Sequence, residues 1–202
     1  MDTTVSIEEV AGLMREFGMS AEDAAEYQDL VQGNLDAVQL IPEPETNRVE
    51  REFEKPPENP LGAWYVRTDI HGASEGRLAG KTVAVKDNVL LAGVPLMNGT
   101  SVLEGYVPEV DAEIVRRMLA EGAVINGKTV CEGYCFSGGS HTAASGLVRN
   151  PHNPAHSAGG SSSGSAVVVA NGEADMAIGC DQGGSIRMPA AFSGIVGMKP
   201  TW

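Results

Sequence analysis

Short apolar runs alternate with a helical pattern from residue 61 onward, and this alternation limits the possible folds more than any other feature of the chain. The runs read TVAV at 82–85, AVIN at 123–126 and DMAIGC at 175–180, and each has the length of a buried strand. Between the first two, DAEIVRRMLAEG at 111–122 predicts an amphipathic helix that Asp111 caps and Gly122 ends. The pattern predicts an α/β fold with a mixed, partly parallel sheet flanked by helices.

One further apolar segment remains ambiguous. SGSAVVVANG at 163–172 is apolar along most of its length, with neither a period of two nor one of 3.6 residues. Periodicity therefore allows a buried helix or a buried strand there.

An acidic segment precedes this part of the chain. Residues 1–60 hold 15 acidic and 4 basic side chains, whereas residues 61–202 hold 12 acidic and 10 basic ones. Ser6 and Glu9 match a capping box and Gly18 is a suitable stop, so a first helix is predicted between them. Its apolar face is expected to consist of Val10, Leu13, Met14 and Phe17.

A second helix is predicted from near Ser20 to Pro42, because proline cannot continue a helix. Its inward-facing residues are expected to be Ala24, Tyr27, Val31 and Val38. Five prolines among charged residues at 42–60 are typical of a linker. We therefore expect an acidic helical extension with a proline-rich linker over 1–60, and a second domain over 61–202.

The charge and the cysteine content exclude several classes of protein. The net charge is −13, and neither part of the chain offers a basic surface, which argues against binding to nucleic acid or to an anionic membrane. Three cysteines are too few and odd in number for a disulfide framework. No apolar run is long enough to span a bilayer, and the N-terminus lacks the pattern of a signal peptide, so we expect a cytoplasmic protein.

Two motif matches have simpler explanations. GAVINGKT at 122–129 fits the phosphate-binding P-loop pattern, but its variable positions are apolar and a helix precedes rather than follows it, so a strand and its turn are expected. Cys131 and Cys135, with His141 nearby, lack the second pair of ligands that a zinc site needs. We expect neither a metal nor another cofactor.

Three segments carry the chemistry. Lys86 directly follows the strand TVAV, AGGSSSGSA fills 158–166, and CDQGGSIRMPA fills 180–190. Each has an ordinary alternative: a solvated lysine, a flexible linker and a common strand-to-helix turn. In the third segment, however, two glycines before a serine let successive backbone N–H groups point at one place, as in an oxyanion hole beside a nucleophile.

Together the three segments resemble the amidase signature family. The resemblance rests on Lys86, on GGSSSGSA and on DQGGSIRMPAAFSGIVGMKPT at 181–201, with 75 residues from Lys86 to Ser161 and 24 from Ser161 to Ser185. It implies a Ser–cis-Ser–Lys triad made of Ser185, Ser161 and Lys86. It also implies that backbone N–H groups stabilise the oxyanion, the candidates being Gln182, Gly183, Gly184 and Ser185.

The implied roles agree with the chemistry of amide hydrolysis. Ser185 would attack the carbonyl carbon and form an acyl-enzyme while ammonia leaves. Lys86 can accept a proton only when it is neutral, a form that burial favours, and Ser161 would relay the proton between the two. The neighbouring serines, Ser162 and Ser163, are expected to satisfy backbone groups, and Ser162 to add a hydrogen bond to the triad. Asp181 and Arg187 are interpreted as structural charges that hold the turn.

Two other segments match less specifically. CFSGGSHTAASG at 135–146 lies where the family has a loop along the acyl pocket, so Ser137, Gly138 and Gly139 are candidate substrate contacts, or simply part of a surface loop. ENPLGAWYV at 58–66, with the helical extension, resembles the broad-specificity amidases that accompany nitrile hydratases. That subgroup dimerises through its N-terminal helices, which implies a homodimer here; alternatively, the extension only covers one side of the domain.

Members of the family continue well beyond the GMKPT segment at 197–201, whereas this chain stops at Trp202. We therefore expect a domain truncated on its C-terminal side, and a 202-residue chain that is poorly folded or inactive by itself, since sheet edges would remain unpaired. The predicted function is hydrolysis of carboxylic acid amides. The alternatives are a non-catalytic or ammonia-supplying component of an amidotransferase-like complex, and an amidase or nitrilase with Cys180 as nucleophile.

Overall fold

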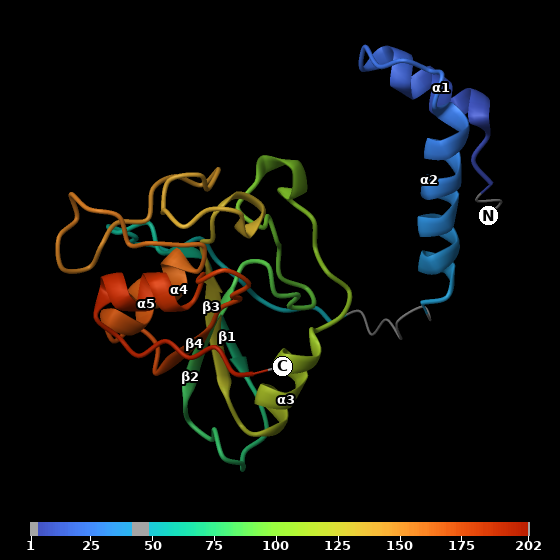
Figure 1. Cartoon of the computed structure of the whole chain (residues 1–202). Helices are drawn as coiled ribbons and strands as arrows, with labels where there is room; N and C mark the ends of the chain where they lie inside the picture. The colour runs from blue at the N-terminus through green and yellow to red at the C-terminus, as the bar shows by residue number, and fades with distance from the viewer. Residues whose placement is uncertain (1–3, 42–48, 202) are drawn as a thin grey trace. The chain divides into compact units, whose positions relative to one another are not determined.

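The computed structural model describes residues 4–41 and 49–201, and the chain divides into two compact units, Met1–Glu45 and Thr46–Trp202 (Figure 1). Part of the expected linker, with Pro42 and Pro44, lies outside the described residues. The division into an extension over 1–60 and a domain over 61–202 stays a prediction.

Two helices, α1 (Ile7–Glu16) and α2 (Ala24–Gln39), form the first unit. α1 begins at the predicted capping box: the Ser6 hydroxyl accepts a hydrogen bond from the Glu9 N–H, and the Glu9 carboxylate accepts one from the Ser6 N–H. These two bonds satisfy N–H groups that the start of a helix otherwise leaves without a partner. The capping box and the helix that follows it are thereby confirmed.

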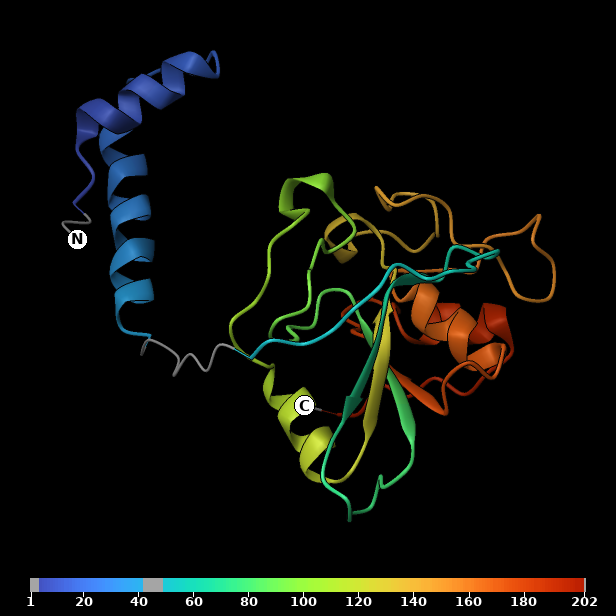
Figure 2. The same cartoon turned by 180° about the vertical axis from the view of Figure 1, so that it is seen from behind.

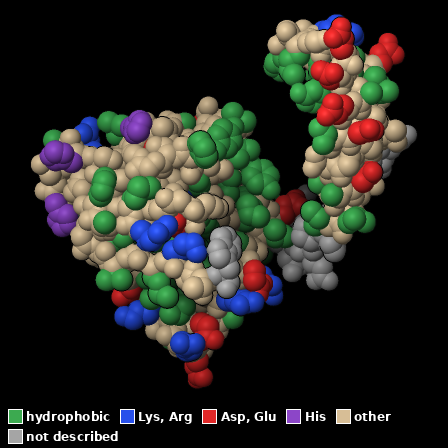
Figure 3. Space-filling view, in the orientation of Figure 1, with side chains coloured by type: hydrophobic (Ala, Val, Ile, Leu, Met, Phe, Trp, Pro, Cys, Tyr) green, Lys and Arg blue, Asp and Glu red, His purple; other side chains and the backbone are tan. Residues whose placement is uncertain are grey.

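The predicted buried faces of this unit are mostly wrong. Val10, Met14 and Ala24 are buried and form a small core with Val5 and Ala11. The other residues expected to face inward are exposed, namely Leu13, Phe17, Tyr27, Val31 and Val38. Two helices offer each other only a narrow stripe of contact, so apolar residues beside that stripe have nothing within the unit to pack against. Acidic side chains are spread along both helices (Figure 3).

The second unit is built on a mixed, partly parallel sheet, as predicted, and this sheet has four strands. The strands are β1 (Trp64–His71), β2 (Thr82–Lys86), β3 (Val124–Thr129) and β4 (Met176–Ile178), in the order β1-β3-β2-β4 (Figure 2). β2 pairs with both β3 and β4 in parallel, whereas β1 pairs with β3 antiparallel. The parallel strands β2, β3 and β4 match the three apolar runs, but β1 has no counterpart among the strands predicted from the sequence.

Helices cover both faces of the sheet. α3 (Glu113–Ala120) lies on one face, whereas α4 (Ser163–Ala170) and α5 (Arg187–Ser193) lie on the other (Figures 1 and 2). Two short 3₁₀ turns, Ser101–Leu103 and Gly133–Cys135, complete the regular structure. None of the helices in the described residues has both the length and the apolarity needed to cross a bilayer.

β2 divides its side chains between the two faces. Val83 and Val85 pack into the core beneath α3, whereas Ala84 packs into the core beneath α4. Side chains of a strand alternate between its faces, so Lys86 follows Ala84 and points toward the α4 side. This alternation decides where the lysine acts.

The ambiguous apolar segment is a helix, α4, which explains its lack of periodicity. Ser163 through Val168 are all buried, so the helix has no polar face to produce a 3.6-residue pattern. Gly164 lets it approach the sheet closely, because a Cβ there would overlap the Ala63 carbonyl oxygen.

The predicted cap of α3 is wrong, whereas the interpretation of the P-loop match as a strand is confirmed. The N-cap of α3 is Ala112, and the Asp111 carboxylate instead binds Arg51 and accepts the Ala92 N–H at 2.8 Å. The Asp111 carboxylate is therefore occupied by an ion pair and a loop contact and does not cap α3. Lys128, the lysine of the P-loop pattern, lies within β3 and is fully buried.

Candidate active site

Lys86 ends β2 and is fully buried. Its side-chain nitrogen donates hydrogen bonds to Ser161 Oγ at 2.7 Å and to Ser162 Oγ at 3.0 Å. Both serines directly precede α4, the helix on the face toward which Lys86 points. Lys86 ends a strand, and its side chain points to the face where α4 begins. It therefore contacts two hydroxyls that lie 75 and 76 residues away in the chain.

Ser161 and Ser162 sit in a packed turn rather than a flexible linker. Both are buried, and the Gly160–Ser161 peptide bond is cis. The Ser162 hydroxyl contacts the backbone N–H and carbonyl oxygen of Cys180, each at 3.3 Å, and Ser163 donates to the Val130 carbonyl. The resemblance to the family led us to expect each of these features.

Ser185 lies beside this turn through its backbone. Its carbonyl oxygen accepts the Ser162 N–H at 3.1 Å, and its side chain is partly exposed. In residues 4–41 and 49–201, no hydrogen bond joins the Ser185 hydroxyl to Ser161. Lys86 and Ser161 are therefore in direct contact, whereas Ser185 joins their turn only through its backbone.

The turn before Ser185 is organised by Asp181. The carboxylate accepts the N–H groups of Gly184 at 2.6 Å and Ile186 at 3.1 Å, and it pairs with the Arg187 guanidinium at 3.0 Å. The hydrogen bond from Arg187, supported by those from the backbone, holds the pKa of Asp181 well below its usual range. These contacts agree with the interpretation of Asp181 and Arg187 as structural charges.

The same contacts bear on the expected oxyanion donors. The Gly184 N–H is engaged by Asp181. Within the described part of the chain, the N–H groups of Gln182, Gly183 and Ser185 have no backbone acceptor, and Gln182 and Gly183 are exposed. These three groups are the ones free to bind an oxyanion.

The loop with Ser137, Gly138 and Gly139 packs against the cis peptide. The Gly160 N–H donates to the Gly138 carbonyl at 2.9 Å, and the Ser137 hydroxyl accepts the Gly139 N–H at 3.0 Å. Gly160 leaves no room for a side chain, since a Cβ there would overlap the Gly139 carbonyl oxygen. All three predicted residues therefore border the site.

A buried ion pair behind Lys86 was missed by the sequence analysis. Asp87 and Lys128 are almost fully buried and lie 2.8 Å apart, and the Asp87 carboxylate also accepts the N–H groups of Met97 and Asn98. Burial raises the pKa of Asp87 and lowers that of Lys128, while their mutual attraction opposes both shifts. The only available signal was the position of Asp87 next to Lys86 at the end of a buried strand.

Glu132 is a second buried carboxylate that the sequence analysis missed. Its Oε2 accepts hydrogen bonds from the Thr142 hydroxyl and from the N–H groups of His141 and Thr142, while its own N–H donates to the Ser161 carbonyl at 3.2 Å. Its Oε1 is buried with no hydrogen-bond partner in the part of the chain that the structure describes. Glu132 thus links the 137–142 loop to the cis peptide.

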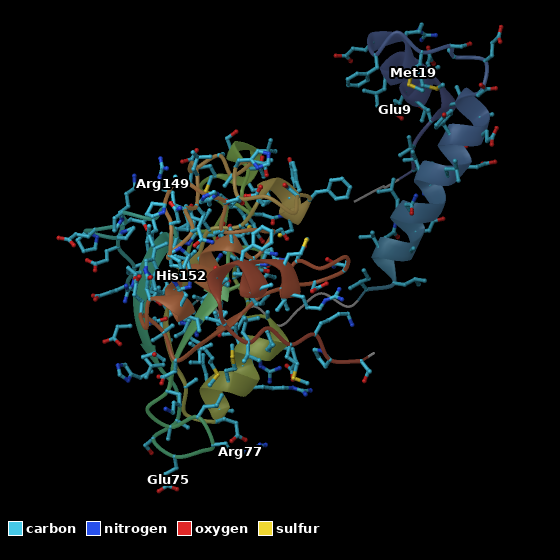
Figure 4. All side chains as sticks on the ribbon, turned by 60° about the vertical axis from the view of Figure 1, so that its left-hand side comes forward. Glu9, Met19, Glu75, Arg77, Arg149 and His152 are labelled. Carbon is cyan, nitrogen blue, oxygen red and sulfur yellow. The ribbon has the colours of Figure 1, made fainter. Side chains whose placement is uncertain are left out.

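A loop from residue 149 to residue 157 holds the far end of α5. Asn150 donates to the Phe192 carbonyl at 2.8 Å, and the His152 ring lies 2.9 Å from the Ser193 carbonyl. Figure 4 labels His152 and Arg149 of this loop. Asp181 fixes the start of α5 and this loop fixes its end, so the turn that holds Ser185 is anchored through both.

Comparisons with known proteins identify the family of the chain. The profile of the family described as Amidase matches residues 61–202. An enantioselective amidase from Rhodococcus rhodochrous is 58% identical over 146 residues, which make up 71% of this chain and 28% of that protein. A glutamyl-tRNA(Gln) amidotransferase subunit from Haloarcula marismortui is 53% identical over 133 residues, 66% of this chain and 31% of that protein.

Solved structures show the same similarity in three dimensions. A glutamyl-tRNA(Gln) amidotransferase subunit from Thermotoga maritima aligns with a TM-score of 0.67 and 36% identity, covering 70% of this chain and 32% of that one. Peptide amidase from Stenotrophomonas maltophilia aligns with a TM-score of 0.59 and 44% identity, covering 62% and 27%. The chain thus spans about a third or less of the length of these relatives. By its matched family profile and its sequence identity to these relatives, the chain belongs to the amidase signature family.

Proposed function

We propose that this protein hydrolyses carboxylic acid amides to the acid and ammonia, with Ser185 as nucleophile, Ser161 as proton relay and Lys86 as base. The observation that carries the proposal is the contact of the buried Lys86 nitrogen with the Ser161 hydroxyl, next to the turn that holds Ser185. A buried amine in contact with a hydroxyl, and a partly exposed second serine beside it, are the parts that a serine amidase without histidine needs.

The reaction begins when Ser185 Oγ attacks the carbonyl carbon of the amide. Its proton passes to Ser161, whose own proton moves to a neutral Lys86. The C–N bond then breaks as the proton returns along the same path to the departing nitrogen, and ammonia leaves. Water, deprotonated through the same relay, attacks the acyl-enzyme and releases the acid.

The tetrahedral intermediate carries a negative oxygen that must be stabilised. The free N–H groups of Gln182, Gly183 and Ser185 lie on the turn that presents the nucleophile. Donors held in place before the reaction cost no reorganisation when the charge develops, and each is worth about 3–4 kcal/mol in a serine hydrolase. Asp181 and Arg187 contribute by keeping this turn in one conformation.

The substrate is proposed to be a small carboxamide whose acyl group passes the loop of Ser137, Gly138 and Gly139. Support comes from the relatives whose names describe an enantioselective amidase and a peptide amidase. Neither the triad nor the oxyanion donors require a metal or another cofactor.

A specific observation also favours a second candidate, a component of an amidotransferase complex. Several relatives, including one that is 53% identical, are named as subunits of glutamyl-tRNA(Gln) amidotransferase. Such a component would share the triad but would act only within a complex. The two candidates differ in whether amide hydrolysis requires ATP and partner proteins.

The test measures ammonia release from simple aliphatic and aromatic amides, without ATP or partners, alongside labelling with a fluorophosphonate that reacts with activated serines. Turnover together with a phosphonylated Ser185 would support the free amidase, and it would overturn the expectation that this 202-residue chain is inactive by itself. Labelling without turnover would favour the amidotransferase component, and a protein that does neither under conditions where it is folded would contradict both.

We further propose that the protein forms a homodimer through α1 and α2. The exposed apolar side chains of this unit, such as Leu30 and Val38, are candidates for burial against a second copy. Hydrophobic surface of this kind on a charged helix pair is typical of an association surface.

A further inference from the structure

Two thiols lie together next to the candidate active site. The sulfurs of Cys131 and Cys135 both donate hydrogen bonds to Oδ1 of Asn98, at 3.9 and 3.3 Å. The two thiols thus share one acceptor, and their side chains also form a hydrogen bond with each other. Neither cysteine is part of the proposed triad, and both are free thiols.

The backbone brings Cys135 back over Cys131. Cys131 follows β3, and the next residue, Glu132, is tied to Ser161 through its N–H. The Gly133–Cys135 turn then reverses the chain, with Tyr134 and Cys135 both in the left-handed region, at φ 50° and 59°. Left-handed conformations in residues other than glycine cost of order 1–3 kcal/mol each, so the surrounding structure holds this turn in place.

The electrostatics of the pair distinguish its two members. The hydrogen bond with the Cys131 thiol, supported by interactions with Lys86 and the Ser161 hydroxyl, outweighs burial and lowers the pKa of Cys135 to about 6. The same hydrogen bond, together with burial and the charge of Asp87, raises the pKa of Cys131. Cys135 is therefore the more acidic of the two thiols and the one that more readily forms a thiolate.

Solvent exposure also favours reaction at Cys135 over reaction at Cys131. Cys131 is fully buried, whereas Cys135 is partly exposed between two exposed aromatic residues, Tyr134 and Phe136. The thiolate, not the thiol, is the reactive form of cysteine. A small oxidant therefore meets Cys135 first and finds Cys131 directly behind it.

We propose that Cys135 and Cys131 are a peroxide-sensitive dithiol whose oxidation switches off the site formed by Lys86 and Ser161. The modification itself follows from the geometry of the two thiols, whereas its effect on hydrolysis rests on the proposed function. A hydroperoxide is the chemical class of reagent, because it is small, and a thiolate attacks it without a metal.

The chemistry balances in two steps. The Cys135 thiolate attacks one peroxide oxygen, the O–O bond breaks, and a sulfenic acid and hydroxide form. The Cys131 sulfur then attacks the sulfenic sulfur, the S–O bond breaks, and the leaving hydroxide departs as water with the Cys131 proton. The dithiol loses two electrons to the peroxide and becomes a disulfide.

Oxidation changes the site in two ways. The disulfide displaces the Cys135 sulfur from its interaction with Lys86 and Ser161. It also constrains the segment from Cys131 to Cys135, which contains Glu132 and its hydrogen bond to Ser161. Both changes act on the relay between Ser185 and Lys86, so the oxidised protein is the inactive form.

The experiment treats the whole chain with hydrogen peroxide and maps its thiols by mass spectrometry after tryptic digestion. Lys128 and Arg149 bound a peptide that holds both Cys131 and Cys135, whereas Cys180 falls in the next peptide and is an internal control. We expect the first peptide to become lighter by a pair of hydrogens and resistant to alkylation, while Cys180 remains alkylatable. A reductant restores both thiols.

Two variants make the result decisive without any measurement of hydrolysis. In Cys131→Ser the Cys135 sulfenic acid has no partner, so we expect it to accumulate and to be trapped by a dimedone probe. In Cys135→Ser the remaining Cys131 should resist peroxide about as well as Cys180 does. Equal reactivity of all three cysteines, or oxidation at Cys180 first, would overturn the proposal.

The effect on hydrolysis is read separately. Loss of ammonia release on oxidation, regained on reduction and absent in Cys135→Ser, would support the switch. A disulfide that forms without changing turnover would refute the switch while leaving the amidase proposal intact. Absence of turnover in the reduced protein would count against the proposed function, but not against the dithiol.

Discussion

Lys86 Nζ lies 2.7 Å from Ser161 Oγ, although 75 residues separate the two in the chain. Both groups are fully buried, so the contact exists only when β2, β4 and α4 are assembled around it. Within this fold a lysine at a strand end becomes part of a relay instead of a surface charge.

Replacing the nucleophile is expected to stop the reaction. Ser185→Ala removes the attacking oxygen and should lower ammonia release by at least about a thousandfold, as in other serine hydrolases that lose a triad residue. Cys180→Ala is the matched control and should keep most of the activity. The reverse outcome would show a cysteine mechanism instead.

Replacing the base is expected to separate activity from stability. Lys86→Met substitutes an apolar chain of similar length for a buried amine, so hydrolysis and fluorophosphonate labelling of Ser185 should fall together while thermal unfolding stays cooperative. Lys81→Met is the control, because Lys81 pairs with Asp175 on the surface. Equal losses of labelling in both variants would contradict a special role for Lys86.

The buried pair behind the site is expected to matter for folding. Lys128→Met leaves the Asp87 carboxylate buried without its partner and should destabilise the protein by about 3–5 kcal/mol in denaturant unfolding. The double variant with Asp87→Asn should recover part of this loss, since no charge is then left alone. If the two single effects simply add, the pair is not coupled.

The destabilisation in Lys128→Met should also depend on pH. Burial raises the pKa of Asp87, and loss of Lys128 raises it further, so lowering the pH protonates the carboxylate and removes the unpaired charge. The stability gap to the parent protein should narrow as the pH falls toward acid values. A gap that widens would contradict the assignment of the charge to Asp87.

The contribution of the Asp181–Arg187 pair to stability is expected to have the opposite pH dependence. The pKa of Asp181 is lowered in the folded state, so its contribution to stability is present above the unfolded pKa and is lost as the pH falls through the folded value. Arg187→Gln should move the acid unfolding of the 181–187 turn to higher pH, as followed by hydrogen exchange. Arg117→Gln, which breaks an exposed pair with Glu113, should not.

The proposed dimer gives a prediction about mass. Leu30→Glu and Val38→Glu place charges on exposed apolar positions of α2 and should produce monomers in sedimentation velocity runs. Gln39→Glu adds the same charge at an exposed position of α2 on the opposite side of the helix from Leu30 and should leave the mass unchanged. If the parent protein is already a monomer, the dimer proposal is wrong.

The sequence predicted the parts that depend on local pattern. Alternating apolar runs predicted strands β2, β3 and β4 of a mixed sheet, and the capping box at Ser6 predicted α1. The motifs singled out Lys86, Ser161 and Ser185 because their spacing matches a family, not because composition separates one serine from another. The Gly/Ser run at 158–166 was therefore assigned to the site, and the structure describes it as buried turn and helix.

Tertiary structure decided what depends on partners far away in the chain. The sequence predicts Asp111 as a helix cap, but in the fold its carboxylate pairs with Arg51. Leu13 and Val31 were expected to be buried, but the two-helix unit is too small to cover them. Lys128, Asp87 and the two thiols at 131 and 135 have no local pattern that reveals their contacts. The physical reason is that strand order and helix placement determine which buried polar groups meet, and a sequence read along its length contains only the order of its residues.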